Sequence, residues 1–73
     1  DNDEAIKFLQ LAVDTGKAEM NQKNYLAQAM SKDGQHEKAK KLLTEVINTE
    51  PDPANLVEDL DDIEEARRLL KDL

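Results

Sequence analysis

The stretch GQHEKAKKLLTEVINTEP, residues 34–51, decides the fold of this chain. A glycine that suits a turn is followed by a run in which Ala39 and Leu43 stand about one helical turn apart. The same residue types, Ala5 and Leu9, occur 34 residues earlier. A period of 34 that repeats small and large residues at matched places is typical of arrays of helical hairpins. Such arrays serve as binding scaffolds, so the period argues against an active site.

The composition favours a single all-α domain. Seventy-three residues allow one domain with a thin core. Charged residues make up 37% of the chain, which suits helical surfaces, and two Gly and two Pro are too few for a turn-rich all-β fold. Phe8 and Tyr25 are the only aromatic residues, so the core must consist of Leu, Ile, Val, Ala and Met. The lack of Cys excludes disulfides and thiolate sites, and it leaves the localisation unknown.

The chain is acidic, with a formal net charge of -7 at pH 7. Residues 44–65 hold nine Asp or Glu and no Lys or Arg. This charge disfavours nucleic acid and anionic membrane surfaces, and it is compatible with a basic protein partner. The acids also fit a second interpretation, a solvated helix face with carboxylates near a helix start. No apolar run approaches the roughly 18 residues of a membrane span, so we expect no membrane insertion.

Hydrophobic periodicity predicts about four helices. The first three run from about residue 3 to 15, 18 to 32 and 36 to 48, because their apolar residues recur at steps of three and four. Gly16 and Gly34 fit the left-handed position that ends a helix. The short connection at Gly34 makes the second and third helices antiparallel neighbours.

The fourth helix follows Pro51. Asp52 is a good N-cap, and Pro53 fits the first helical position. The apolar stripe then continues to the end of the chain as one helix, with or without a soft joint near residues 59–61. The alternative is two pieces, with Asp61 capping a shorter terminal helix.

Helical spacing also predicts where some side chains lie. Tyr25 falls in the apolar stripe of the second helix, so we expect it in the core. Glu37 and Lys41 stand four residues apart, as do Glu64 and Arg68, and each pair is expected to form an ion pair.

A self-comparison at a shift of 34 residues pairs these identical residues: Ala5 with Ala39, Lys7 with Lys41, Leu9 with Leu43, Thr15 with Thr49, Asn21 with Asn55 and Leu26 with Leu60. In this register the chain resembles the tetratricopeptide repeat family, whose pattern has a large and a small residue, a turn glycine, then alanine, a bulky residue and proline. The matching residues are Leu26, Ala27, Gly34, Ala39, Leu43 and Pro51. The chain departs from the family at three places where aromatic residues are common: Lys23, Met30 and His36.

The resemblance implies antiparallel helical hairpins stacked as a right-handed solenoid. Residues 1–19 are then the second helix of a preceding repeat, residues 20–53 one complete repeat, and residues 54–73 a C-terminal capping helix, all within one domain. The ending ARRLL, residues 66–70, is similar to the last helix of bacterial multi-repeat proteins. The chain does not begin with Met, so we expect it to be a piece of a longer protein.

We expect no catalytic residue, metal or cofactor. His36 is the only imidazole and Ser31 the only serine, and neither has a partner at a recognised motif spacing. The carboxylates of residues 59–65 lack the glycine and the spacing of a calcium loop. Gly16 and Gly34 are isolated and form no phosphate loop. A metal-binding enzyme fragment is therefore the least favoured hypothesis.

The resemblance implies that the first helix of the complete repeat lines a concave, partner-binding face. Its outward positions in this chain are Asn21, Asn24, Gln28 and Lys32. Amides bond the backbone of an extended peptide, and a lysine meets a carboxylate. We thus expect a protein–protein interaction scaffold with a protein or peptide partner. An ordinary solvated face is the other interpretation.

The alternative function is a structural capping or self-association domain without a ligand of its own. An acidic last helix suits a cap, because terminal repeats need a polar outer face. The first helix carries apolar residues that we expect to be partly bare, namely Ile6, Phe8 and Leu11. These residues are candidates for a homodimer contact.

Overall fold

The computed structural model describes residues 2–73, with side chains from Asp3 onward, and Asp1 lies outside the described residues. This part of the chain is helical and contains no strand, which confirms the all-α prediction. In chain order the elements are α1 (Asn2–Asp14), α2 (Met20–Lys32), α3 (His36–Ile47), the single 3-10 turn η1 (Pro53–Asn55) and α4 (Leu56–Lys71).

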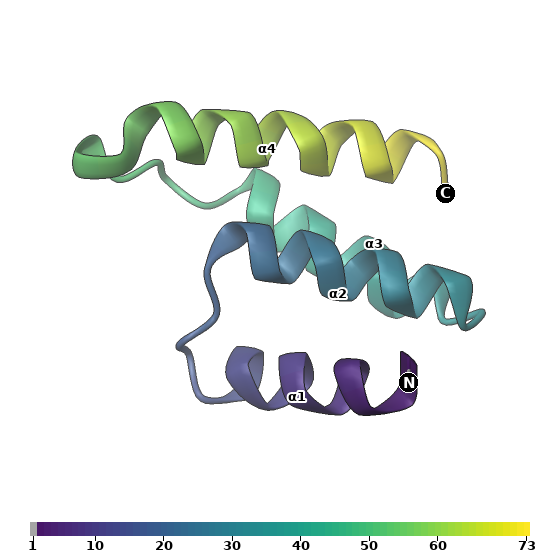
Figure 1. Ribbon diagram of the computed structural model, residues 1–73. Helices are drawn as coiled ribbons and strands as arrows, with labels where there is room; N and C mark the ends of the chain where they lie inside the picture. Colours follow the sequence, from purple (N-terminus) through teal and green to yellow (C-terminus); the bar gives the residue numbers. More distant parts are fainter. Residues whose placement is uncertain (1) are drawn as a thin grey trace.

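Consecutive helices are antiparallel, so α2 and α4 run in the same direction (Figure 1). The backbone of α4 packs against both α2 and α3, whereas the α1 backbone approaches only α2 among the helices of residues 2–73. The first helix therefore lies at one edge of the stack and α4 at the other, with the α2–α3 hairpin between them.

Gly16 and Gly34 end α1 and α2 in the same way. Their φ angles are 73° and 83°, in the left-handed region that glycine adopts without strain. Behind Gly34, the amide of Gln35 donates to the Met30 carbonyl at 2.8 Å and the amide of Gly34 donates to the Ser31 carbonyl at 3.1 Å. This pair of bonds satisfies two carbonyls at the end of α2 and defines a Schellman motif. The two predicted glycine stops are confirmed.

Asp52 and Pro53 start the last helix, as the sequence predicts. The Asp52 carboxylate accepts a hydrogen bond from the Ala54 amide at 2.9 Å, and Pro53 is the first residue of η1. The Asp59 carboxylate reaches back and accepts from the Asp52 amide at 2.7 Å. The chain then continues without interruption from Leu56 to Lys71, so α4 has no second start at Asp61.

The core lies where α2, α3 and α4 meet, and it combines alanines with larger aliphatic side chains. Ala39 and Ala66 have no exposed surface, which lets the helix backbones approach closely. Leu26, Leu43 and Val46 are the largest fully buried side chains, and each stabilises the fold by about 1.5–3 kcal/mol through burial. From the edge of the stack, α1 adds three apolar side chains to this core. Ile6, Leu9 and Val13 pack against it and are partly buried.

Candidate functional site

A single stripe of α2 faces away from the core. Asn21, Tyr25, Gln28 and Lys32 are exposed, and their steps of four and three place them on one face of the helix. Tyr25 keeps 59% of its surface exposed, so the prediction that it belongs to the core is wrong. The exposed tyrosine gives this otherwise polar face an aromatic centre.

Asn24 does not belong to that stripe. It is 3% exposed, so its predicted outward position is wrong. Its side-chain amide turns toward α4 and donates to the backbone carbonyl of Asp62 at 2.9 Å, while its Oδ1 is buried without a hydrogen-bond partner among the described residues. Helical periodicity alone did not predict the burial of Asn24. In the sequence, a short asparagine at the edge of an apolar stripe looks like a surface residue, because the acceptor that it bonds belongs to another helix.

On α4, the residues beside this stripe are mostly acidic. Steps of three and four place Glu58, Asp62, Glu65 and Leu69 along one face of the helix, and its C-cap Asp72 continues the row. Because α2 and α4 run in the same direction, their starts lie at one end of the stack and their C-termini at the other (Figure 1). Two depressions lie between them, one at each end.

The depression at the helix starts is an acidic cleft of about 500 Å³. Lys23 is the one basic residue among the described residues that line it, and the carboxylates are Glu19, Glu50, Asp52, Glu58, Asp59 and Asp62. Partial burial, followed by the negative charges of Asp59 and other nearby acids, raises the pKa of Asp62. Burial first, and crowded negative charge second, thus disfavour the ionised form of Asp62.

Some carboxylates of the acidic cleft hold helix starts in place. Glu19 caps α2 in a capping box, in which the Glu19 amide donates to the Gln22 side chain at 2.9 Å. Asp52 and Asp59 form the bonds at the start of η1 and α4 described above. These three carboxylates fit the solvated helix-start interpretation. That interpretation does not account for Glu50, Glu58 and Asp62. The hydrogen bonds and ion pairs described for residues 3–73 do not involve the side chains of these three acids.

The depression at the helix ends is an apolar pocket of about 170 Å³. Its apolar lining comes from three helices and the residues after α4: Ala27, Leu43, Leu69 and Leu73. Polar residues complete the lining: Gln28, Ser31, Lys32 and Asp72. Gln28 and Lys32 thus belong both to the exposed stripe of α2 and to this pocket.

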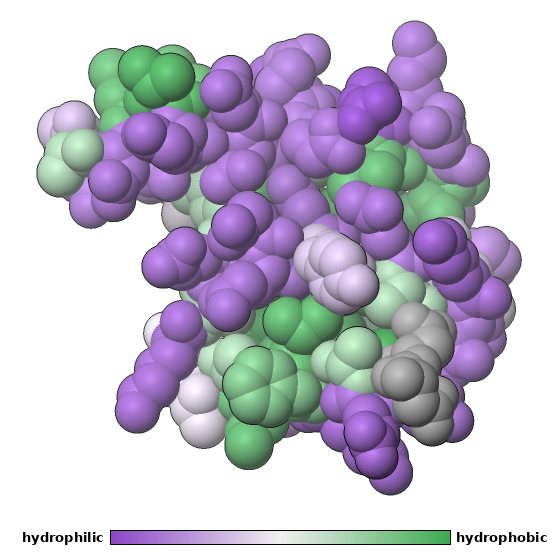
Figure 2. Space-filling view, in the orientation of Figure 1, coloured by the Kyte–Doolittle hydropathy of each residue, from purple (hydrophilic) through white to green (hydrophobic). Residues whose placement is uncertain are grey.

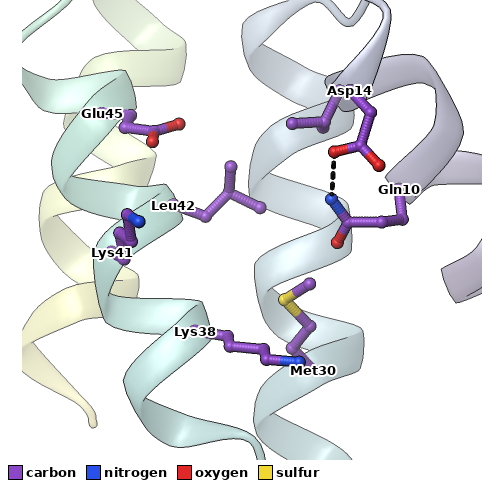
Figure 3. A pocket seen from close by; sticks show the side chains of 8 residues that line it. Gln10, Asp14, Met30, Lys38, Lys41, Leu42 and Glu45 are labelled. Carbon is purple, nitrogen blue, oxygen red and sulfur yellow. Dashed lines mark hydrogen bonds between the residues drawn. The ribbon is translucent and has the colours of Figure 1, made fainter.

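A separate groove of about 420 Å³ lies between α1 and α3, on the opposite flank of α2 (Figure 3). Met30 and Leu42 contribute its apolar surface, and Lys38 and Lys41 extend from α3. Across the groove, Gln10 donates to the Asp14 carboxylate at 2.9 Å. The lining of this groove carries both positive and negative charges, and Gln10 and Asp14 bond to each other. The groove therefore presents no set of groups that would select one class of ligand.

Apolar side chains are also exposed at both edges of the stack. Phe8 and Leu11 on α1 keep 71% and 62% of their surface exposed, while Ile6 is half-buried against the core. A second group lies at the start of α4 and consists of Leu56, Val57 and Leu60. Figure 2 shows green areas over α1 and at the start of α4, with hydrophilic side chains between them.

The described residues bring Ser31 close to His36 but form no group of side chains that could hold a metal ion. Ser31 Oγ lies 3.5 Å from His36 Nδ1, at the long limit of a hydrogen bond, and both groups are on the surface. Among residues 3–73, no carboxylate bonds to the His36 ring, and no cluster of three His, Asp or Glu side chains has the geometry to hold a metal ion. None of the helices in this part of the chain is long and apolar enough to cross a membrane.

Comparison of the chain with models of known protein families, with curated proteins and with solved structures finds no match. The resemblance to tetratricopeptide repeats thus stays a prediction that rests on the residues quoted above.

Proposed function

We propose that this chain is a non-catalytic protein–protein interaction scaffold, built as a tetratricopeptide-like fragment. The observation that carries the proposal is the pair of parallel helices α2 and α4, between which two depressions lie, one at each end. We call this surface the α2–α4 groove. In a right-handed solenoid of helical hairpins, the first helices of successive hairpins lie side by side in this way and line the concave face. Residues 20–53 then form a repeat, residues 1–19 its preceding helix and residues 54–73 a cap.

The side chains of the α2 stripe suit recognition of a peptide. Tyr25 offers a rigid aromatic surface with a hydroxyl, and such residues contribute strongly to binding interfaces. Asn21 and Gln28 supply amides that bond a peptide backbone, and Lys32 supplies a positive charge at the far end. Asn24 has a different role, because its amide joins α2 to α4 and so sets the width of the groove.

Selection from a phage-displayed library of random peptides tests the proposal, followed by amide chemical-shift mapping of the selected peptides on the labelled chain. We expect the largest shifts at Asn21, Tyr25 and Gln28, and a loss of affinity of at least tenfold in Tyr25→Ala. Lys41→Ala, exposed on α3 outside the groove, is the control and is expected to bind normally. Peptides that map only to other surfaces would contradict the proposal.

One observation favours a second candidate function, self-association through α1. Phe8 and Leu11 are the two most prominent exposed apolar residues of that helix. Exposed apolar groups of this kind are typical of protein contacts. Sedimentation over a range of concentrations tests it: self-association raises the average mass with concentration, and Phe8→Glu with Leu11→Glu abolishes the rise. A mass that stays monomeric at high concentration would rule it out.

A further inference from the structure

We infer that the α2–α4 groove takes an extended peptide that carries a cationic side chain at one end and an aliphatic side chain at the other. The inference rests on the proposed function and specifies its partner. The cation occupies the acidic cleft at the starts of α2 and α4, and the aliphatic group occupies the apolar pocket at their C-terminal ends.

The two depressions are ends of one recognition surface. Asn21 on α2 and Asp62 on α4 line the acidic cleft, and Gln28 on α2 and Leu69 on α4 line the apolar pocket. Each helix thus contributes residues to both ends. Tyr25 lies on α2 between them, in position to pack against the middle of a bound peptide.

The acidic end selects a cation. Glu50, Glu58 and Asp62 line the cleft without the helix-start bonds that the Asp52 and Asp59 carboxylates accept, and outside the capping box of Glu19. The ion pairs Glu37–Lys40, Glu64–Arg67 and Glu65–Arg68 lie elsewhere, on α3 and in the second half of α4. A guanidinium or ammonium group from a partner would relieve the crowding of negative charge around Asp62. An arginine fits best, because its fork of donors bonds two carboxylates together.

The apolar end selects a side chain without charge. Leu43 and Ala27 are almost fully buried at the base of the pocket, and Leu69 and Leu73 are half-buried beside it. Burial of a leucine or methionine side chain here contributes favourably through the hydrophobic effect. At the base, Leu43 and Ala27 offer a charged side chain no polar partner for the hydration it would lose, and the charged residues of the lining, Lys32 and Asp72, are exposed.

The distance between the ends sets the spacing in the peptide. Along α2, Asn21 and Lys32 are separated by about 16 Å at 1.5 Å per residue. An extended chain advances about 3.3 Å per residue, so the cationic and aliphatic side chains are roughly four to five residues apart. At the edge of the apolar pocket, the Gln28 amide can bond the peptide backbone, because it has both a donor and an acceptor.

The peptides selected from the phage-displayed library supply the test. We expect those that map to the groove to be enriched in Arg or Lys four to five residues from Leu, Ile or Met. A synthetic copy of the best one is expected to lose at least tenfold in affinity when its basic residue becomes Glu, and again when its aliphatic residue becomes Ser. Its affinity is also expected to fall as salt is raised.

Variants of the chain complete the test. Glu58→Lys is expected to weaken binding at least tenfold and to restore affinity for the peptide with Glu in place of its basic residue. Glu45→Lys makes the same change of charge on an exposed part of α3 outside the groove and is expected to bind normally. Groove-binding peptides without the basic and aliphatic pair would overturn this inference and leave the proposed function standing. Peptides that never map to the groove would overturn both.

Discussion

The side-chain amide of Asn24 donates to the backbone carbonyl of Asp62 at 2.9 Å and joins α2 to α4 across 38 residues of sequence. Asn24→Ala removes this bond, and we expect it to lower the free energy of unfolding by about 1 kcal/mol. Asn24→Asp is expected to cost more, because an ionised carboxylate has no donor for the carbonyl and is buried beside an acidic cleft. Urea unfolding at neutral pH measures both.

Asn21→Asp is the matched control, because it makes the same substitution one helical turn earlier on the exposed face. We expect its effect to stay within about 0.5 kcal/mol. Equal losses in Asn24→Asp and Asn21→Asp would mean that net charge, and not the bond between helices, controls the stability.

The helices and their boundaries were largely predictable because their signals are local. The glycine stop at Gly34 depends on backbone conformation, and the cap at Asp52 depends on a bond to a residue two positions away. The mistake at Asn24 and Tyr25 has a different cause. These neighbours point about 100° apart on a helix, and which of them is buried depends on where α4 packs.

The ion pairs show a similar limit. Glu37 pairs with Lys40 at 3.9 Å instead of the predicted Lys41, and Glu64 pairs with Arg67 at 3.9 Å instead of Arg68. Partners three and four residues away lie on the same helix face, so spacing does not choose between them. In α4 a second acid, Glu65, takes Arg68. The α2–α4 groove could not be predicted from the sequence, because its two walls belong to helices that are separated along the chain by the whole of α3.

Ala39 and Ala5 occupy matched places in the period of 34 residues but different environments. Ala39 is fully buried, and Ala5 is half-buried because no helix among residues 2–73 covers its outer side. Ala39→Leu is expected to lower the free energy of unfolding by about 1–3 kcal/mol through overpacking. Ala5→Leu is expected to change it by less than about 0.5 kcal/mol. Thermal unfolding compares the pair, and equal losses would contradict the asymmetry.

Substitutions at Gly34 test the cost of its left-handed backbone conformation without any steric clash. A Cβ atom at this position meets nothing within 4 Å, so the cost of a substitution comes from its φ of 83° alone. We expect Gly34→Ala to cost about 1–2 kcal/mol and Gly34→Asn to cost less, because asparagine adopts the left-handed conformation more readily. Chemical denaturation gives the order. A harmless Gly34→Ala would show that the turn rearranges.

Asp62 makes stability depend on pH. Partial burial, then the charges of Asp59 and its acidic neighbours, raises the pKa of Asp62 above its ordinary value of 3.8. The folded chain therefore holds this proton to a higher pH than the unfolded chain does. As pH rises from below 3.8 through the raised pKa, the contribution of Asp62 to stability decreases, and it stays low at neutral pH.

Asp62→Asn removes this titration and leaves the backbone carbonyl that Asn24 bonds in place. We expect the variant to be more stable than the parent near neutral pH, by up to about 0.5 kcal/mol, with the difference disappearing in acid below the ordinary pKa. Urea unfolding across this pH range measures it. Glu45→Gln removes one exposed charge outside the cleft and controls for the lower net charge. A difference that is the same at every pH would show that the titration of Asp62 is not its cause. The same variant is expected to bind the basic peptide more weakly, since the carboxylate that costs stability in the free chain is the one that pairs with the cation in the complex.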